Sequence, residues 1–128
     1  MSTAMEFEFE LSQRFFFDAA HTLRRAHDTA SSLRVHGHTY HAEVSVQGAR
    51  DAATGMVVDL AVLRAEIETL RQTLDHHLLD EVPGLGTPTL ENLCAYIATA
   101  LRERQLPVSA VRVWREAGGD SCRLVLPR

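Results

Sequence analysis

The sequence predicts an α+β domain in which a four-stranded antiparallel sheet carries two helices on one face. Two observations lead to this fold class. Apolar and polar residues alternate near both ends of the chain, as in half-buried strands. Between these segments, apolar residues recur every three to four positions, as in amphipathic helices. The order is therefore β-β-α-α-β-β, and 128 residues suffice for a single domain, residues 1–128, but not for two.

The first two strands are predicted at residues 6–17 and 38–47, with a polar loop at 22–35 between them. In the first segment, Phe7, Phe9 and Leu11 alternate with polar residues. The second segment alternates more clearly, with Tyr40, Ala42, Val44 and Val46 on one face.

Two helices follow the second strand. Asp59 is placed to cap the first helix, and Thr89 is placed to cap the second. Helical spacing marks the stripes Leu60, Leu63, Ile67, Leu70 and Leu74, then Leu90, Leu93, Ile97 and Leu101. A loop at residues 75–88, rich in proline and glycine, separates them.

The last two strands are predicted at residues 109–116 and 122–126, joined by a turn at 118–120. A single sheet of this kind leaves one face and two edges uncovered. Oligomerisation is a natural way to cover them.

Composition excludes several classes of function. The 13 basic and 17 acidic residues give a net charge of −4, and no basic run is present to bind a nucleic acid. No segment approaches the roughly 20 apolar residues of a membrane span. The N-terminus does not resemble a signal peptide, and Cys94 and Cys122 form no CxxC pair. We therefore expect a cytoplasmic protein without a cysteine-based zinc site.

Seven histidines indicate a metal site. His36 and His38 are two apart and point to the same side of a strand. If the first two strands pair, their ends meet and His21 joins them. Three imidazoles suit Zn²⁺ and leave a fourth position open. The alternative for this spacing is a pair of surface histidines, and His27 and His41 are interpreted as solvated or structural.

The chain also resembles a known family, the 6-pyruvoyl-tetrahydropterin synthase / 6-carboxytetrahydropterin synthase family. The resemblance spans nearly the whole chain, and its specificity comes from six short motifs in family order. These motifs are residues 17–21 (FDAAH), 36–40 (HGHTY), 55–60 (GMVVDL), 74–79 (LDHHLL), 88–92 (PTLEN) and a C-terminal strand ending in Glu116.

The resemblance implies the tunnelling fold, in which three subunits close their sheets into a barrel and two trimers stack into a homohexamer with active sites between subunits. It implies that His21, His36 and His38 bind zinc. The implied substrate is a small pterin, 7,8-dihydroneopterin triphosphate or a close relative.

Further roles follow from the same resemblance. Glu116 resembles the glutamate that anchors the pterin ring, and Thr89 and Glu91 are candidates for the pocket lining. Asp75 and His76 resemble the family's paired aspartate and histidine, in which the carboxylate orients an imidazole that moves protons. Without the resemblance, Glu116 reads as a solvated strand-end residue, Thr89 as a helix cap, and Asp75-His76 as a helix C-terminus.

The chain departs from the family at Ser32, where many members carry a catalytic cysteine. A hydroxyl is a far weaker acid than a thiol, so Ser32 is a poor base unless it is activated. The favoured reading remains a zinc-dependent lyase that makes a 6-substituted tetrahydropterin, with 6-carboxytetrahydropterin of the queuosine (deazapurine) route preferred over 6-pyruvoyl-tetrahydropterin. The alternatives are aldolase-type cleavage of a pterin side chain, non-catalytic binding of zinc and a pterin or purine, and an unrelated three-histidine hydrolase.

Overall fold

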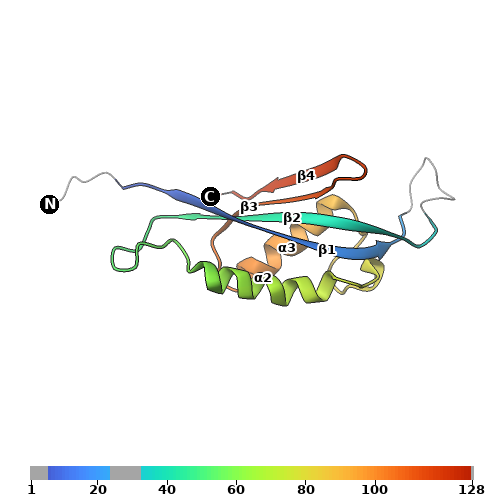
Figure 1. Cartoon of the computed structure of the whole chain (residues 1–128), viewed down its shortest axis with the longest axis horizontal. Coiled ribbons are helices and arrows are strands. Elements are labelled where there is room, and N and C mark those ends of the chain that lie inside the picture. Colours follow the sequence, from blue (N-terminus) through green and yellow to red (C-terminus); the bar gives the residue numbers. More distant parts are fainter. Residues whose placement is uncertain (1–5, 24–32, 128) are drawn as a thin grey trace.

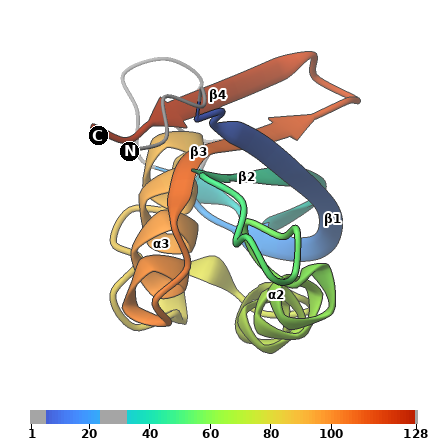
Figure 2. The same cartoon turned by 90° about the vertical axis from the view of Figure 1, so that its left-hand side faces the viewer.

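The computed structural model describes residues 6–23 and 33–127. Its elements are β1 (Phe9–His21), β2 (His36–Gly48), α2 (Leu60–Leu74), η1 (Leu79–Glu81), α3 (Leu90–Glu103), β3 (Val108–Arg115) and β4 (Asp120–Val125). The four strands form one antiparallel sheet in the order β1-β2-β3-β4. Both long helices lie on the same face of this sheet (Figures 1 and 2). The predicted α+β fold is therefore confirmed.

Most strand boundaries differ from the prediction by one to three residues, with β2 beginning at His36 and not at residue 38, and three differences change the description of the fold. β1 continues to His21 instead of ending at residue 17, because its ladder with β2 runs without a break from Phe9 opposite Gly48 to His21 opposite His36. The turn η1 interrupts the predicted loop at 75–88. β4 begins at Asp120, which pairs with Arg115, and not at Cys122. For β1 and β4, backbone pairing continues into residues whose apolar alternation is too weak to predict a strand.

The core fills the space between the sheet and the helices. Phe17 and Tyr40 stack there with ring centroids 5.2 Å apart, and both are almost fully buried. The helices contribute Leu63, Ile67, Leu70, Leu74, Leu93, Ile97 and Leu101. Leu60 lies on the predicted stripe but is 38% exposed, because it begins the first turn.

Both predicted helix caps are present. The Asp59 carboxylate accepts a hydrogen bond from the Ala61 N–H at 2.8 Å, and the Thr89 hydroxyl accepts one from the Asn92 N–H at 3.1 Å. Each satisfies a backbone donor that the first helical turn leaves free. The capping role of Thr89 also fixes where the preceding residue, Pro88, presents its carbonyl.

The segment that follows α2 covers part of the outer edge of β1. The His76 N–H donates to the Asp18 carbonyl at 2.6 Å, and the Ala20 N–H donates to the His77 carbonyl at 3.1 Å. A short parallel bridge between Ala20 and Leu78 continues the contact. Residues 75–78 are thereby held against the C-terminal end of β1, where the metal site was predicted.

The sheet face away from the helices is largely polar. Arg14 pairs with Glu43 at 2.8 Å, and the guanidinium groups of Arg14 and Arg112 lie 5.4 and 4.3 Å from the Trp114 ring centroid. The oligomeric barrel, which would enclose such a face, stays a prediction. Within the described residues no helix is long and apolar enough to cross a membrane.

Candidate metal and proton-transfer site

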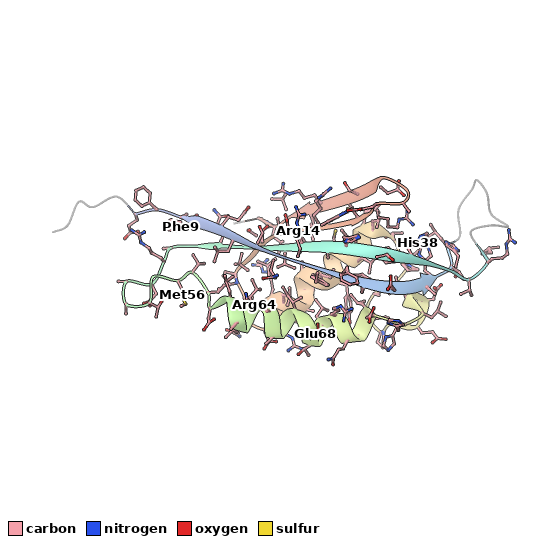
Figure 3. All side chains as sticks on the ribbon, in the orientation of Figure 1. Phe9, Arg14, His38, Met56, Arg64 and Glu68 are labelled. Atoms are coloured by element: carbon pink, nitrogen blue, oxygen red, sulfur yellow. The ribbon has the colours of Figure 1, made fainter. Side chains whose placement is uncertain are left out.

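Three histidines meet at one end of the sheet. His21 ends β1 and lies opposite His36, which begins β2, and His38 follows two residues later on the same face. The ring centroids are 4.6 to 5.0 Å apart. His38 lies at the opposite end of the sheet from Phe9 and Met56 (Figure 3). The pairing register alone therefore brings two strand ends into one cluster.

Hydrogen bonds fix which nitrogen of each ring carries the proton. His21 Nδ1 lies 3.1 Å from the Pro88 carbonyl, and His36 Nδ1 lies 2.7 Å from the Arg34 carbonyl. A carbonyl only accepts, so both Nδ1 atoms are protonated in the neutral rings. His38 Nε2 accepts from Arg115 Nη1 at 3.1 Å, which assigns its proton to Nδ1 as well. All three Nε2 atoms therefore carry a lone pair.

These lone pairs converge. His21 Nε2 lies 2.9 Å from His36 Nε2 and 3.1 Å from His38 Nε2. With the protons on Nδ1, none of the three Nε2 atoms has a hydrogen to share, so the contacts are repulsive unless a cation lies among them. Tetrahedral ligands at a Zn–N distance of about 2.0–2.1 Å are separated by about 3.3 Å. The two distances from His21 are close to this value, and the three ligand atoms all lie within 4.8 Å of one another. The donor set thus fits Zn²⁺, with Pro88 and Arg34 as the outer hydrogen-bond partners of two ligands.

The surroundings favour the neutral form of two rings of the cluster, His21 and His38. Burial lowers the pKa of His21, against the opposing effect of its bond to Pro88. Burial and then the nearby Arg115 charge lower the pKa of His38 to about 4. Neutral imidazole is the form that binds a metal, so these two rings are ready for binding at neutral pH.

Asp75 and His76 form a hydrogen-bonded pair beside this cluster. Asp75 Oδ2 lies 2.8 Å from His76 Nδ1, and Asp75 Oδ1 accepts from the Asp18 N–H at 2.9 Å. The bond from Asp18 and then the bond with His76 lower the pKa of the Asp75 carboxyl, so it is ionised at neutral pH. The carboxylate orients the ring and leaves Nε2 free to take or give a proton.

His76 has an unusual backbone. Its φ is 58°, in the left-handed region that residues other than glycine seldom adopt. The backbone bond from His76 to Asp18 holds this conformation in place. Strain of this kind is maintained at functional sites, and here it turns the imidazole back toward Asp75.

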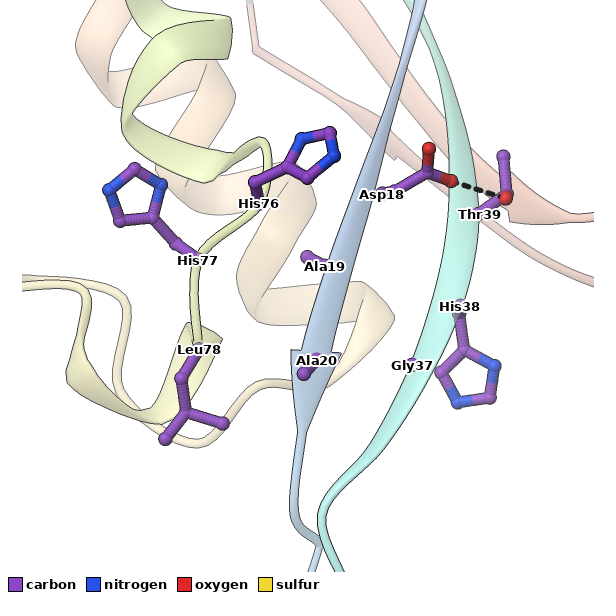
Figure 4. Close-up of a pocket in the computed structure, with 9 residues that line it drawn as sticks. All are labelled: Asp18, Ala19, Ala20, Gly37, His38, Thr39, His76, His77 and Leu78. Carbon is purple, nitrogen blue, oxygen red and sulfur yellow. Dashed lines mark hydrogen bonds between the residues drawn. The ribbon is translucent and has the colours of Figure 1, made fainter.

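An open hollow of about 510 Å³ lies between the paired ends of β1 and β2 and the segment that follows α2 (Figure 4). Its lining comprises Asp18, Ala19, Ala20, Gly37, His38, Thr39, His76, His77 and Leu78. The Thr39 hydroxyl donates to Asp18 across its floor. His38 and His76 thus line the same hollow, although they belong to different elements.

The other predicted residues are placed less centrally. Glu116 is exposed just after β3 and lines an adjoining hollow of about 440 Å³ with His38 and Arg115. Glu91 is exposed in the first turn of α3, and Thr89 follows the Pro88 carbonyl that binds His21. Ser32 and His27 lie outside the described residues. His41 stacks on Trp114 with centroids 5.5 Å apart, in a group separate from the cluster.

The sequence reasoning missed two further residues of this region. Arg115 contacts His38, and Asp80 binds both the N–H and the hydroxyl of Thr22, next to His21. Arg115 had a signal, since it continues the inward alternation of Val111 and Val113 on β3. Asp80 had none, because it lies in the short turn η1.

Comparisons with known proteins agree with this geometry. A family profile described as 6-pyruvoyl tetrahydropterin synthase matches residues 10–124. A 6-carboxy-5,6,7,8-tetrahydropterin synthase from Synechocystis sp. is 37% identical over 100 residues, which cover 74% of this chain and 76% of that protein. A 6-pyruvoyl tetrahydrobiopterin synthase from Homo sapiens is 34% identical over 116 residues, covering 80% and 79%.

Solved structures show the same fold. The 6-pyruvoyl tetrahydropterin synthase from Caenorhabditis elegans superposes with a TM-score of 0.81, covering 95% of this chain and 98% of that one at 23% identity. Its likeness supports the tunnelling architecture. The profile match and the relatives above 30% identity show that this chain belongs to the 6-pyruvoyl tetrahydropterin synthase family.

Proposed function

We propose that the protein is a zinc-dependent lyase that converts 7,8-dihydroneopterin triphosphate into 6-carboxytetrahydropterin. One observation carries the proposal: in a chain of this family, three imidazole lone pairs converge beside the hydrogen-bonded pair Asp75–His76. A metal ligand set and a proton carrier are the two parts that such a reaction needs. Both line one hollow, through His38 and His76.

The choice of product rests on the relatives. Proteins from Synechocystis sp. and Archaeoglobus fulgidus, 37% and 35% identical to this chain, are named 6-carboxy-5,6,7,8-tetrahydropterin synthase, the second as putative. Relatives named 6-pyruvoyl tetrahydrobiopterin synthase are similar at nearly the same level, 34% for Homo sapiens. We favour the carboxylated product, and we propose that the enzyme serves deazapurine (queuosine) synthesis in the cytoplasm.

His21, His36 and His38 would hold the metal through Nε2. The Nδ1–H groups of His21 and His36 donate to the Pro88 and Arg34 carbonyls, which keeps these two rings in position. Bound zinc supplies Lewis acidity, which lowers the pKa of substrate hydroxyls and polarises a developing carbonyl. His76 would take a proton from the substrate side chain and return it, while Asp75 stabilises the imidazolium that forms. This relay does not require the cysteine that Ser32 replaces.

The remaining predicted residues belong to substrate binding. Glu116 would accept two hydrogen bonds from the amino and N–H edge of the pterin ring, a bidentate arrangement suited to a carboxylate. It adjoins His38 through the second hollow, which supports this role. Thr89 and Glu91 would line the pocket, and Ser32 stands in the sequence where many family members carry the catalytic cysteine.

We further propose that the site is completed in a homohexamer built from two trimers. The His76 side chain is 79% exposed in the single chain, which is unusual for a residue that moves protons away from water. β1 and β4 form the edges of the sheet, and β4 and the part of β1 before Phe16 are open to pairing with other copies. An adjoining subunit would cover both features at once.

The decisive experiment incubates zinc-loaded protein with 7,8-dihydroneopterin triphosphate and identifies the products by mass spectrometry, with chelated protein as the control. We expect 6-carboxytetrahydropterin from the loaded protein alone. A different cleaved pterin would support aldolase-type chemistry instead. Unchanged substrate, with zinc and pterin both bound, would overturn the enzyme proposal and favour a binding role.

A further inference from the structure

Arg71 is a charged residue of α2 whose contacts the proposed reaction does not yet explain. It lies in the last turn of the helix, and its side chain is only 25% exposed. Nε donates to the Phe16 carbonyl at 2.6 Å, and Nη2 lies 3.4 Å from Asp75 Oδ2. The guanidinium carbon also lies 5.5 Å from the centroid of the Phe16 ring. An arginine that only complemented the helix dipole would have no reason to bind a strand, so these contacts indicate a further role.

The side chains of Arg71 and Asp75 occupy the outer edge of β1 in place of a neighbouring strand. β1 ends the sheet on this side, so the backbone groups that point outward need other partners. The Phe16 carbonyl accepts from Arg71. The Asp18 N–H donates to Asp75 Oδ1 at 2.9 Å, and the Asp18 carbonyl accepts from the His76 N–H. Asp75 is therefore attached to β1 at two points, directly through Asp18 and indirectly through Arg71.

The two oxygens of the Asp75 carboxylate have different partners. Oδ1 binds β1, whereas Oδ2 lies 2.8 Å from His76 Nδ1 and 3.4 Å from Arg71 Nη2. A carboxylate oxygen can accept from both donors. The bond from Asp18, then the bond with His76 and, more weakly, the Arg71 charge lower the pKa of the Asp75 carboxyl. Arg71 thus shares a negative charge that would otherwise act on His76 alone.

The charged and titratable groups around His76 come from several elements. They are Glu68 and Arg71 on α2, Asp18 on β1, His38 on β2, Asp75 and His77 on the connection after α2, and, outside the hollow, Asp80, Arg115 and Glu116. The Asp18 carboxylate accepts from the Thr39 hydroxyl, and Glu68 lies 3.6 Å from Arg71 Nη1. Among the described residues, Arg71 is the one cation other than His76 itself that pairs with Asp75.

We propose that Arg71 is a positioning residue for proton transfer, which holds the Asp75 carboxylate on the edge of β1 with Oδ2 directed at the His76 ring. This inference rests on the proposed function, because it assigns Arg71 to the proton-transfer step of that reaction. Without Arg71, Asp18 alone anchors the carboxylate, so the imidazole is oriented less well. The carboxylate charge is also no longer shared, so it stabilises the protonated ring more strongly.

The test measures kcat and KM for 7,8-dihydroneopterin triphosphate against pH in zinc-loaded wild type, Arg71→Gln and Arg71→Lys. We expect Arg71→Gln to lower kcat about 5- to 50-fold and to change KM less than about 2-fold, because only the proton carrier is misplaced. The acidic limb of its kcat profile should move up by about 0.3 to 0.7 pH units, since one cation near an exposed ring is lost. Arg71→Lys keeps the charge but loses the planar fork, so it should restore the limb and only part of kcat.

Arg64→Gln is the matched control. Arg64 lies on the same helix, but it is exposed and lines a separate hollow with Phe9 and Met56 at the other end of the sheet (Figure 3). It should keep the wild-type kcat and pH profile. Unchanged kcat in Arg71→Gln would overturn the proposal. A lower kcat without a shift of the acidic limb would also overturn it, because that result indicates only a smaller folded fraction.

A second measurement needs no substrate and separates this inference from the pterin reaction. Protein with ¹⁵N-labelled histidine is titrated, and long-range ¹H–¹⁵N spectra report the tautomer and the titration midpoint of His76, assigned with His76→Asn. We expect the Nδ1–H tautomer in wild type, and in Arg71→Gln more of the Nε2–H tautomer and a higher midpoint. If these changes are found while wild type forms no product, the lyase proposal fails and the positioning of the pair by Arg71 stands. Identical His76 signals in the two proteins overturn the positioning role, even if wild type forms the product.

Discussion

The three-histidine cluster and the Asp75–His76 pair lie at the same end of the molecule but are built in different ways. The cluster is formed by ladder positions of the paired strands β1 and β2, and His21 is only 4% exposed. The pair lies on a connection after α2, and the His76 side chain is 79% exposed. One is fixed by the sheet, and the other by a few hydrogen bonds at its edge.

This difference explains what each part can do in a single chain. Two rings of the cluster are oriented within the chain, His21 by the Pro88 carbonyl and His36 by the Arg34 carbonyl. It should therefore bind metal without a partner subunit. The pair has an oriented imidazole but little protection from water, so we expect proton transfer to depend on assembly. Metal affinity and turnover should consequently respond to different substitutions.

The largest effect is expected for His36→Ala. Loss of one of three ligands should lower zinc affinity by more than the roughly 10- to 100-fold that follows loss of an outer hydrogen-bond partner, and turnover should disappear with the metal. Zinc content and competition with a chelating dye measure the affinity. His41→Ala is the control, because it removes an imidazole from the same strand outside the cluster. Equal zinc affinity in His36→Ala and wild type would show that the cluster is not the metal site.

The next effect separates the two regions. His76→Asn should lower kcat by about 10²- to 10⁴-fold and leave zinc content unchanged, because the substitution removes the proton carrier alone. Asparagine is chosen because it tolerates the left-handed backbone at this position. Steady-state kinetics and metal analysis are done on the same preparations.

His77→Asn is the matched control for this variant. His77 is the next residue on the segment and lines the same hollow, but its Nδ1 bonds to the Asp75 carbonyl rather than to the carboxylate. It should retain most of the wild-type kcat. Full activity in His76→Asn would assign proton transfer to another group, and loss of zinc would mean that the two regions are not independent.

The difference between a site on paired strands and a site on a connecting segment also determines how much could be predicted from the sequence. The period-two spacing of His36 and His38 and the pairing of two alternating segments were sufficient to place three imidazoles together, because strand geometry is regular. The fold followed from periodicity for the same reason. Side chains on turns obey no such period, so Asp80 was missed and the relation of His76 to Asp18 was not foreseen.

Arg115 shows a different limit. The alternation of β3 predicts that the Arg115 side chain points toward the core face. A charged residue on such an apolar face normally indicates that the strand ends there, unless its partners are known. Those partners, His38 and Asp120, come from two other strands. The family motif instead predicts a role for the neighbouring Glu116. Only the register among three strands shows which of the two residues faces the histidines.

The smallest expected effect is a pH dependence of folding in the chelated protein. Burial and the Arg115 charge hold the pKa of His38 at about 4, below the ordinary 6.5, and burial also lowers that of His21. As pH falls below 6.5 the unfolded chain takes up protons that the folded chain does not, so the free energy of unfolding should decrease toward pH 4. Since His38 is partly exposed, we expect only about 1 kcal/mol from it after solvent screening is allowed for. Urea unfolding at pH 7, 5.5 and 4.5 measures the decrease, and His38→Gln should reduce it. If His38→Gln shows the same decrease in the free energy of unfolding as wild type, the pH dependence arises from groups outside the cluster.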